Sequence, residues 1–176
     1  MDPLFNSHET GTAFTHCCDC NCELTDASFH IVNQSYSGSE CIFEFAMCYS
    51  CREKLNAQLS EESRVAVFDF MHDNTDMEKR EKSLGNNSET EAYIEHCVTC
   101  NKPRKEAAGY TLGAMFVDQT ILKGQFPILI CDTCELELSE KISDETRDVW
   151  DKFIEENFPC PPSDAKLPKQ RKPVML

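Results

Sequence analysis

Four pairs of cysteines, each separated by two residues, constrain this chain more than any other feature of its sequence. The pairs are Cys17 and Cys20, Cys48 and Cys51, Cys97 and Cys100, and Cys131 and Cys134. A CxxC turn can place two thiolates on one metal ion, and a second pair completes a tetrahedron. Because 27 residues separate the first two pairs and 30 separate the last two, the sequence predicts two four-cysteine metal sites.

Zinc is the metal that this donor set favours, because four thiolates suit a tetrahedral, redox-inert ion. Iron in a rubredoxin-type site uses the same ligands and stays an alternative. Four thiolates leave no open position for water or substrate, so we expect two structural Zn²⁺ ions per chain and no catalytic metal. Such small units have marginal cores, and structural zinc adds on the order of 10 kcal/mol of apparent folding free energy.

The chain also contains one pattern twice. Residues 48–74 match residues 131–157 at an offset of 83, which aligns Ser60 with Ser143 and Arg64 with Arg147. Upstream, "HCCDCN" from His16 matches "HCVTCN" from His96 at an offset of 80. These matches indicate a tandem duplication, with a first zinc unit at 16–74 and a second at 94–159. The other segments are predicted as a flexible N-terminus (1–15), a polar linker (75–93) and a Pro-rich, basic, disordered tail (160–176).

Each unit has the residue pattern of two strands followed by helix. Residues 28–36 and 41–48, and residues 109–118 and 125–131, are rich in β-branched and aromatic residues and predict a hairpin in each unit. The helices behind the second CxxC pairs carry apolar stripes: Leu55, Leu59, Ala66, Val67, Phe70 and Met71, matched by Leu138, Ile142, Val149, Trp150, Phe153 and Ile154. Ser60 and Ser143 each precede two acidic residues and predict an N-cap, so a short helix should be followed by a longer one.

The expected fold is therefore α+β, with two duplicated zinc-bound units of hairpin plus helix packed through their helices as a pseudo-symmetric pair. Two independent beads on a linker are the alternative. The order CxxC, hairpin, CxxC, helix resembles tandem treble-clef four-cysteine zinc fingers. The stretch "FPILICDTCELELSEKI" at 126–142 resembles part of the N-terminal zinc-binding domain of the Clp-type unfoldase, a domain that binds adaptor proteins and dimerises.

Charge and hydropathy narrow the setting in which the protein works. The net charge is −14, and an acidic surface repels phosphate backbones, so nucleic acid is disfavoured as a partner. No apolar run is long enough to cross a membrane, and the N-terminal residues do not resemble a secretory signal. We therefore expect a cytoplasmic protein, where twelve cysteines are more typical of metal ligands than of disulfides.

The remaining histidines and cysteines have no assigned chemistry. His16 and His96 precede the knuckles at matching positions, and we expect them to pack beside sites that four thiols already complete. His30 falls on a predicted strand, where some treble-clef nucleases carry a catalytic histidine, but the second unit has no equivalent. Cys18, Cys22 and Cys41 have no counterparts in the second unit and are interpreted as small buried or tolerated residues. Cys160 is a spare thiol in the tail.

The resulting functional expectation is a non-enzymatic, zinc-stabilised protein-interaction or adaptor module, with oligomer formation left open. Two alternatives remain: a nucleic-acid-binding zinc finger acting through its hairpins or tail, and a thiol redox sensor using the unrepeated cysteines. The acidic helix positions are interpreted as a solvated face, with docking of a basic partner as the alternative. These positions are Glu61, Glu62, Asp69, Asp144, Glu145, Asp148, Asp151 and Glu155.

Overall fold

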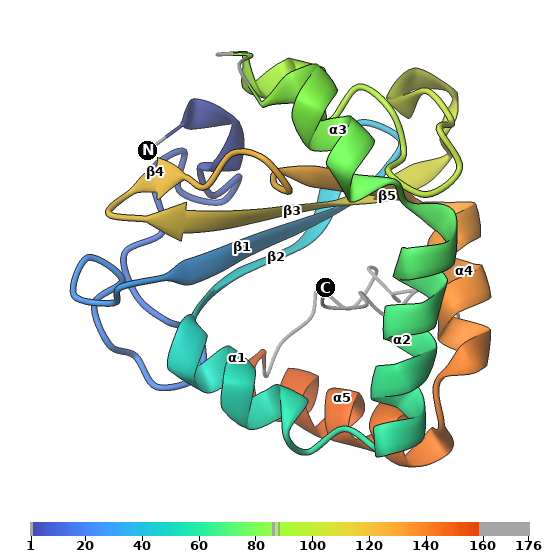
Figure 1. Ribbon diagram of the computed structural model, residues 1–176. Helices are drawn as coiled ribbons and strands as arrows, with labels where there is room; N and C mark the ends of the chain where they lie inside the picture. The colour runs from blue at the N-terminus through green and yellow to red at the C-terminus, as the bar shows by residue number, and fades with distance from the viewer. Residues whose placement is uncertain (1, 86, 88, 159–176) are drawn as a thin grey trace.

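A computed structural model describes residues 2–85, 87 and 89–158. The predicted tail at 160–176, including Cys160, lies outside the described residues. The described part of the chain is a mixed helix-and-sheet protein (Figure 1).

The centre of the fold is an antiparallel sheet to which both halves of the chain contribute strands. Its order is β2 (Glu40–Cys48), β1 (His30–Ser37), β3 (Gly109–Val117) and β4 (Thr120–Ile121), and β5 (Ile128–Cys131) also pairs with β3. Strands β1 and β2 form the hairpin predicted for the first half. In the second half, β5 pairs with β3 as predicted, but the short β4 intervenes along the chain.

The β1–β3 ladder joins the two halves, a pairing that the helix-packed arrangement expected from the sequence does not include. Eight residues of β1 pair in antiparallel register with β3, from His30 opposite Phe116 to Ser37 opposite Gly109. At the middle of this ladder Asn33 lies opposite Gly113. The halves therefore meet first through backbone hydrogen bonds between strands, not only through helix packing.

The helices follow the predicted pattern of a short helix and then a longer one. In the first half α1 (Tyr49–Asn56) precedes α2 (Glu61–Asn74), and in the second half α4 (Asp132–Lys141) precedes α5 (Asp144–Asn157). Ser60 and Ser143 are confirmed as N-caps, because their side chains accept hydrogen bonds from the N–H groups of Ser63 and Thr146. Figure 1 shows these four helices on one side of the sheet.

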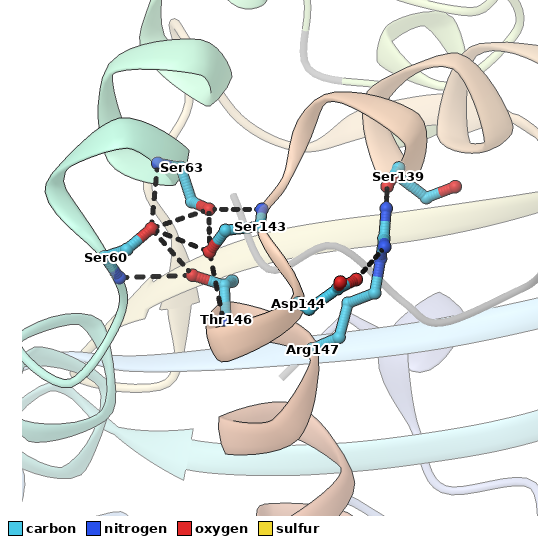
Figure 2. A network of polar contacts seen from close by, with 7 residues as sticks. All are labelled: Ser60, Ser63, Ser139, Ser143, Asp144, Thr146 and Arg147. Carbon is cyan, nitrogen blue, oxygen red and sulfur yellow. Dashed lines mark hydrogen bonds and ion pairs between the residues drawn. The ribbon is translucent and has the colours of Figure 1, made fainter.

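The two capped helix ends meet in a network of hydroxyl groups, shown in Figure 2. The Oγ atoms of Ser60 and Ser143 lie 2.9 Å apart. The backbone N–H of Ser60 donates to Thr146 Oγ1 at 3.1 Å, and the N–H of Ser143 donates to Ser63 Oγ at 2.8 Å. Each half thus supplies both a donor and an acceptor, and a pair of matched serines lies at the centre.

Both faces of the sheet are covered, which explains why seven consecutive residues of β1 are buried. On the helix side, Phe45 of β2 packs against Phe153 of α5 with ring centroids 6.0 Å apart. On the other side, Phe5 packs edge-on against Phe116 of β3 at 5.9 Å. The core is therefore continuous across the two halves.

Two segments expected to be loosely organised are instead packed on that second face. In the N-terminal segment, expected to be flexible, Pro3–Phe5 forms a 3-10 helix and Phe5 is fully buried. Within the expected linker, α3 spans Met77–Leu84 and a 3-10 turn spans Thr90–Tyr93. Arg80 of α3 donates to the carbonyl groups of Tyr93 and Pro127 at 2.6 and 2.7 Å. Buried aromatic anchors and one arginine hold these polar stretches, a tertiary effect that composition does not report.

Candidate metal centres

The first CxxC of each half forms a tight turn of the same geometry. Cys17 N–H donates to the Cys22 carbonyl at 2.9 Å, and Cys97 N–H donates to the Lys102 carbonyl at 2.8 Å. Between them Asn21 and Asn101 adopt left-handed conformations, with φ of 58° and 61°, which asparagine tolerates better than most residues. The shared Cys-x-x-Cys-Asn sequence thus produces the same knuckle twice.

The second CxxC of each half follows a strand and enters a helix. Strand β2 ends at Cys48 and strand β5 ends at Cys131, and these residues are the N-caps of α1 and α4. The backbone N–H of Cys48 donates to Cys17 Sγ at 3.4 Å, and that of Cys131 donates to Cys97 Sγ at 3.3 Å. Strand, helix and knuckle therefore bring the two CxxC pairs of each half together.

In the second half the four thiols gather as the sequence predicted. The sulfur atoms of Cys97, Cys100, Cys131 and Cys134 all lie within 4.8 Å of one another. The Cys100 and Cys131 sulfurs are 3.6 Å apart. Ligands about 2.3 Å from a tetrahedral zinc ion lie about 3.8 Å from one another, so this separation fits a shared ion. This group can hold a metal ion through four sulfur ligands.

In the first half the thiols gather around a different fourth cysteine. The group whose sulfurs all lie within 4.8 Å consists of Cys17, Cys20, Cys22 and Cys48. The Cys20 and Cys48 sulfurs are 3.9 Å apart, close to the separation in the second half. Cys51, the fourth ligand that the repeat predicted, lies beside the group, with the Cys20 and Cys48 side chains within hydrogen-bonding reach. Five thiols therefore surround the first site, and the assignment of Cys51 as a ligand stays a prediction.

Each site contains one thiol that ionises readily. Hydrogen bonds from the backbone N–H and side chain of Cys22 lower the pKa of Cys20 to about 6. Burial opposes ionisation of Cys97, but hydrogen bonds from the backbone of Cys100 and from the Thr99 side chain outweigh it and lower its pKa to about 7. Since a metal binds the thiolate, both sites present a ligand in its binding form near neutral pH.

The unrepeated cysteines outside this group are unsuited to thiolate chemistry. Burial raises the pKa of Cys18 well above its usual range, and burial followed by the Glu44 charge raises that of Cys41 to about 12. Protonated thiols react slowly with oxidants. Cys22, which was expected to be a small buried or tolerated residue like Cys18 and Cys41, lies in the first metal group; in the sequence, only its place two residues after Cys20 indicates this.

The histidines contribute no ligand to either thiol group among the described residues. His16 is exposed and lies 2.9 Å from the Thr15 hydroxyl. His30 is 1 % exposed and stacks on Phe116 with ring centroids 5.1 Å apart, and neither ring nitrogen has a hydrogen-bond partner within the described chain. Burial lowers the pKa of His30. It is therefore a neutral core residue at pH 7.

A third group consists of His8, Cys41 and Glu44 and lies on the face of the sheet that the N-terminal segment covers. Glu44 accepts hydrogen bonds from the Ser7 hydroxyl at 2.7 Å and from the His8 N–H at 2.9 Å, while His8 Nε2 lies 2.8 Å from the Tyr36 hydroxyl. These contacts already use the carboxylate to hold the N-terminal segment against β2. We therefore interpret this group as an intramolecular contact that holds the N-terminal segment on the sheet, and not as a metal site.

The fold and these groups define a mixed helix-and-sheet protein with two four-cysteine groups, each able to hold a metal ion. Comparisons with protein-family models, with curated proteins and with solved structures find no match for this chain. The resemblance to treble-clef fingers and to the Clp-type domain therefore rests on the sequence alone, through the order CxxC, hairpin, CxxC, helix and the stretch at 126–142. No helix in the described ranges combines the length and apolarity that spanning a bilayer requires.

Proposed function

We propose that this chain is a non-enzymatic, cytoplasmic protein-interaction module stabilised by two structural zinc ions. The observation that carries the proposal is the gathering of four or more thiols at each site, with sulfur separations suited to a tetrahedral ion. Zinc bound by four thiolates has no open position for substrate. The sites would then serve the fold, and function would belong to the surface.

The proposal includes a duplication in which the two zinc units form a pseudo-symmetric pair. Contacts between the two halves support it: Ser60 and Ser143 align under the offset of 83, and Asn33 and Gly113 are separated by the 80 positions that relate the two knuckles. Asn33 lies opposite Gly113, and Ser60 Oγ lies beside Ser143 Oγ. The Ser60–Thr146 and Ser143–Ser63 hydrogen bonds are reciprocal under the offset of 83. Reciprocal contacts of this kind are typical of an interface between two copies related by a two-fold axis.

An exposed aromatic residue supports an interaction role. Phe68 on α2 is 68 % exposed, and Val65 on the same helix is 51 % exposed. Because residues three apart on a helix are neighbours, Val65 and Phe68 form one exposed apolar patch, and such patches mark interaction sites when they are contiguous and large.

Two measurements test the proposal. Native mass spectrometry should find two zinc ions per folded chain. A folded chain that carries no zinc and whose thiols are all freely alkylated would refute the metal sites. Photo-crosslinking in the source cell, with the crosslinker at position 68, should trap a discrete partner. A crosslinker at the exposed position 155 serves as the control, and identical patterns from both positions would count against an interaction surface.

A further inference from the structure

A groove of ≈ 440 Å³ opens between α1, α2 and the segment that leads into β5. Most of its apolar lining comes from Leu59, Val67, Phe68, Met71, Met77 and Phe126. The lining combines residues from both halves of the chain, so the groove exists only because the two units pack together. A volume of this size is typical of sites that bind a ligand or the side chains of a peptide.

The groove arises because the same apolar stripe is used differently in the two halves. The two stripes differ at two of their six aligned positions, because in the second half Ile142 is 7 % and Trp150 3 % exposed. In α2 only Phe70 of the matching apolar positions is buried. Leu59 and Val67, which align with Ile142 and Trp150, are half-buried and line the groove. The first half thus leaves partly uncovered two apolar positions that the second half buries.

The two halves also differ at the position of Phe68. Its aligned position in α5 is Asp151, a half-buried acidic residue. An aromatic ring at the edge of an apolar groove is the kind of residue that anchors a protein contact. Met71 and Met77 line the groove next to it, and their flexible side chains adapt to the shape of a bound chain.

Two arginines give the groove its charge. Arg52 and Arg64 both line it, and no acidic residue does, although the chain has 31 acidic residues against 17 Lys and Arg. Arg52 Nε is buried without a hydrogen-bond partner in the described chain. Arg64 is exposed and forms no ion pair among the described residues.

The aligned arginine of the second half, Arg147, has its hydrogen-bond partners within the chain. Arg147 donates to Asp144 Oδ1 at 2.6 Å and to the Ser139 carbonyl at 2.7 Å (Figure 2). The same position therefore carries an arginine that is paired internally in one half and directed to a groove in the other. Together with the buried Nε of Arg52, this leaves two guanidinium groups suited to an external carboxylate.

We infer that this groove binds a peptide segment of a partner protein that carries apolar side chains next to one or more carboxylates. The apolar side chains cover Phe68 and the methionines, and the carboxylates pair with Arg52 and Arg64. A basic segment would meet two cations here, and a nucleic acid backbone has no apolar side chains for the floor. The inference rests on the proposed interaction function and names the chemistry of the partner.

The test is a selection from a random-peptide display library against the full zinc-loaded chain, followed by affinity measurements on synthetic winners. Winners should contain Asp or Glu beside large apolar residues. The Arg52→Gln/Arg64→Gln variant should weaken their binding at least about tenfold, and Phe68→Ser should do the same. The charge-matched control Lys54→Gln/Lys152→Gln, which changes exposed lysines outside the groove, should stay within about twofold of wild type.

Analogues of the winners with Glu replaced by Gln complete a double-mutant cycle. On the wild-type chain, these analogues should bind at least about tenfold more weakly than the original peptides. On the arginine variant, the same replacement should cause little further loss of affinity, because the two changes remove one interaction. Peptides that need Phe68 but not a carboxylate would overturn the partner chemistry and leave the interaction function standing. If no selected peptide lost affinity on changing Phe68 or the arginines, the groove would not be the binding site. Zinc counting and crosslinking test the proposed function separately.

Discussion

Asn33 of β1 and Gly113 of β3 lie opposite each other in the ladder that joins the two halves of the chain. They are separated by 80 positions, the offset that also relates His16 to His96. The shared ladder and the continuous core bind the halves into one sheet. Two beads on a linker would share neither feature, so we expect the halves to unfold together.

Thermal unfolding should therefore be a single transition. Trp150, the only tryptophan, is buried on α5 and reports on the second half, whereas far-ultraviolet circular dichroism reports on all helices and strands. The two signals should change at the same temperature, because two-state unfolding gives coincident transitions for different probes. Two separated transitions would show that the halves are independent.

Removal of metal should unfold the protein. Structural zinc contributes on the order of 10 kcal/mol of apparent folding free energy per site, more than a small domain can spare. Incubation with excess EDTA should abolish the near-ultraviolet circular dichroism signal, and added Zn²⁺ should restore it. EDTA saturated with zinc serves as the control, and a fully folded metal-free chain would contradict this prediction.

The first metal site should tolerate the loss of a cysteine that the second cannot. Five thiols surround the first site, whereas Lys102 occupies the position of Cys22 in the second. We expect Cys22→Ser and Cys51→Ser each to retain two zinc ions by native mass spectrometry, and the double variant to retain one. Cys134→Ser, the matched change in the second half, should retain one.

The outcome also assigns the ligands of the first site. If Cys51→Ser alone lost a zinc ion, the repeat-based assignment of Cys51 would hold and Cys22 would be a neighbour. If Cys22→Ser alone lost it, Cys22 would be the fourth ligand.

The serine network at the helix ends should contribute measurably to stability. Ser143→Ala removes an N-cap and the contacts of its hydroxyl with Ser60 and Ser63, and should lower the free energy of unfolding by about 1–2 kcal/mol. Because Ser60 and Ser143 are in contact, the double alanine variant should depart from additivity by about 0.5 kcal/mol or more. Urea denaturation measures both values.

Ser139→Ala provides the control for this network. The Ser139 hydroxyl is exposed and donates only to the Leu136 carbonyl, while Arg147 uses its backbone carbonyl, which alanine keeps. Its effect should stay within about 0.5 kcal/mol. Equal losses from Ser139→Ala and Ser143→Ala would show that the network adds nothing.

His30 should make the protein sensitive to mild acid. Burial lowers its pKa in the folded state below the ordinary value of 6.5. As pH falls below 6.5, the unfolded chain takes up a proton that the folded chain refuses, so stability is lost from that point downward. His30→Leu should change the free energy of unfolding by about 1 kcal/mol or less at pH 7.

Comparison of the two proteins isolates this histidine from the acid release of zinc, which both share. The stability of His30→Leu relative to wild type should rise as pH is lowered from 6.5 to 5, measured by urea denaturation at each pH. A difference that does not change with pH would show that His30 does not titrate as proposed.

Local sequence signals predicted much of this structure correctly. Capping by Ser60 and Ser143, the short and long helices behind each second CxxC pair, and the β1–β2 hairpin all depend on contacts between residues close in the chain. The four thiols of the second half are not local neighbours, but the repeated CxxC spacing predicted their grouping. The prediction weakened where the partner of a residue lay far away: Phe5 against Phe116, Arg80 against Pro127, and Cys22 beside Cys48.

The sequence by itself determined that two sets of thiols, each delivered by a knuckle and a helix start, can hold metal, because the spacing of CxxC turns restricts where their sulfur atoms can go. Only the tertiary structure decided that β1 pairs with β3 and that Ile142 and Trp150 are core while the matching Leu59 and Val67 line a groove. Pairing and burial depend on which surfaces meet in space. Matching positions of a repeated pattern can therefore be core in one half and line a groove in the other.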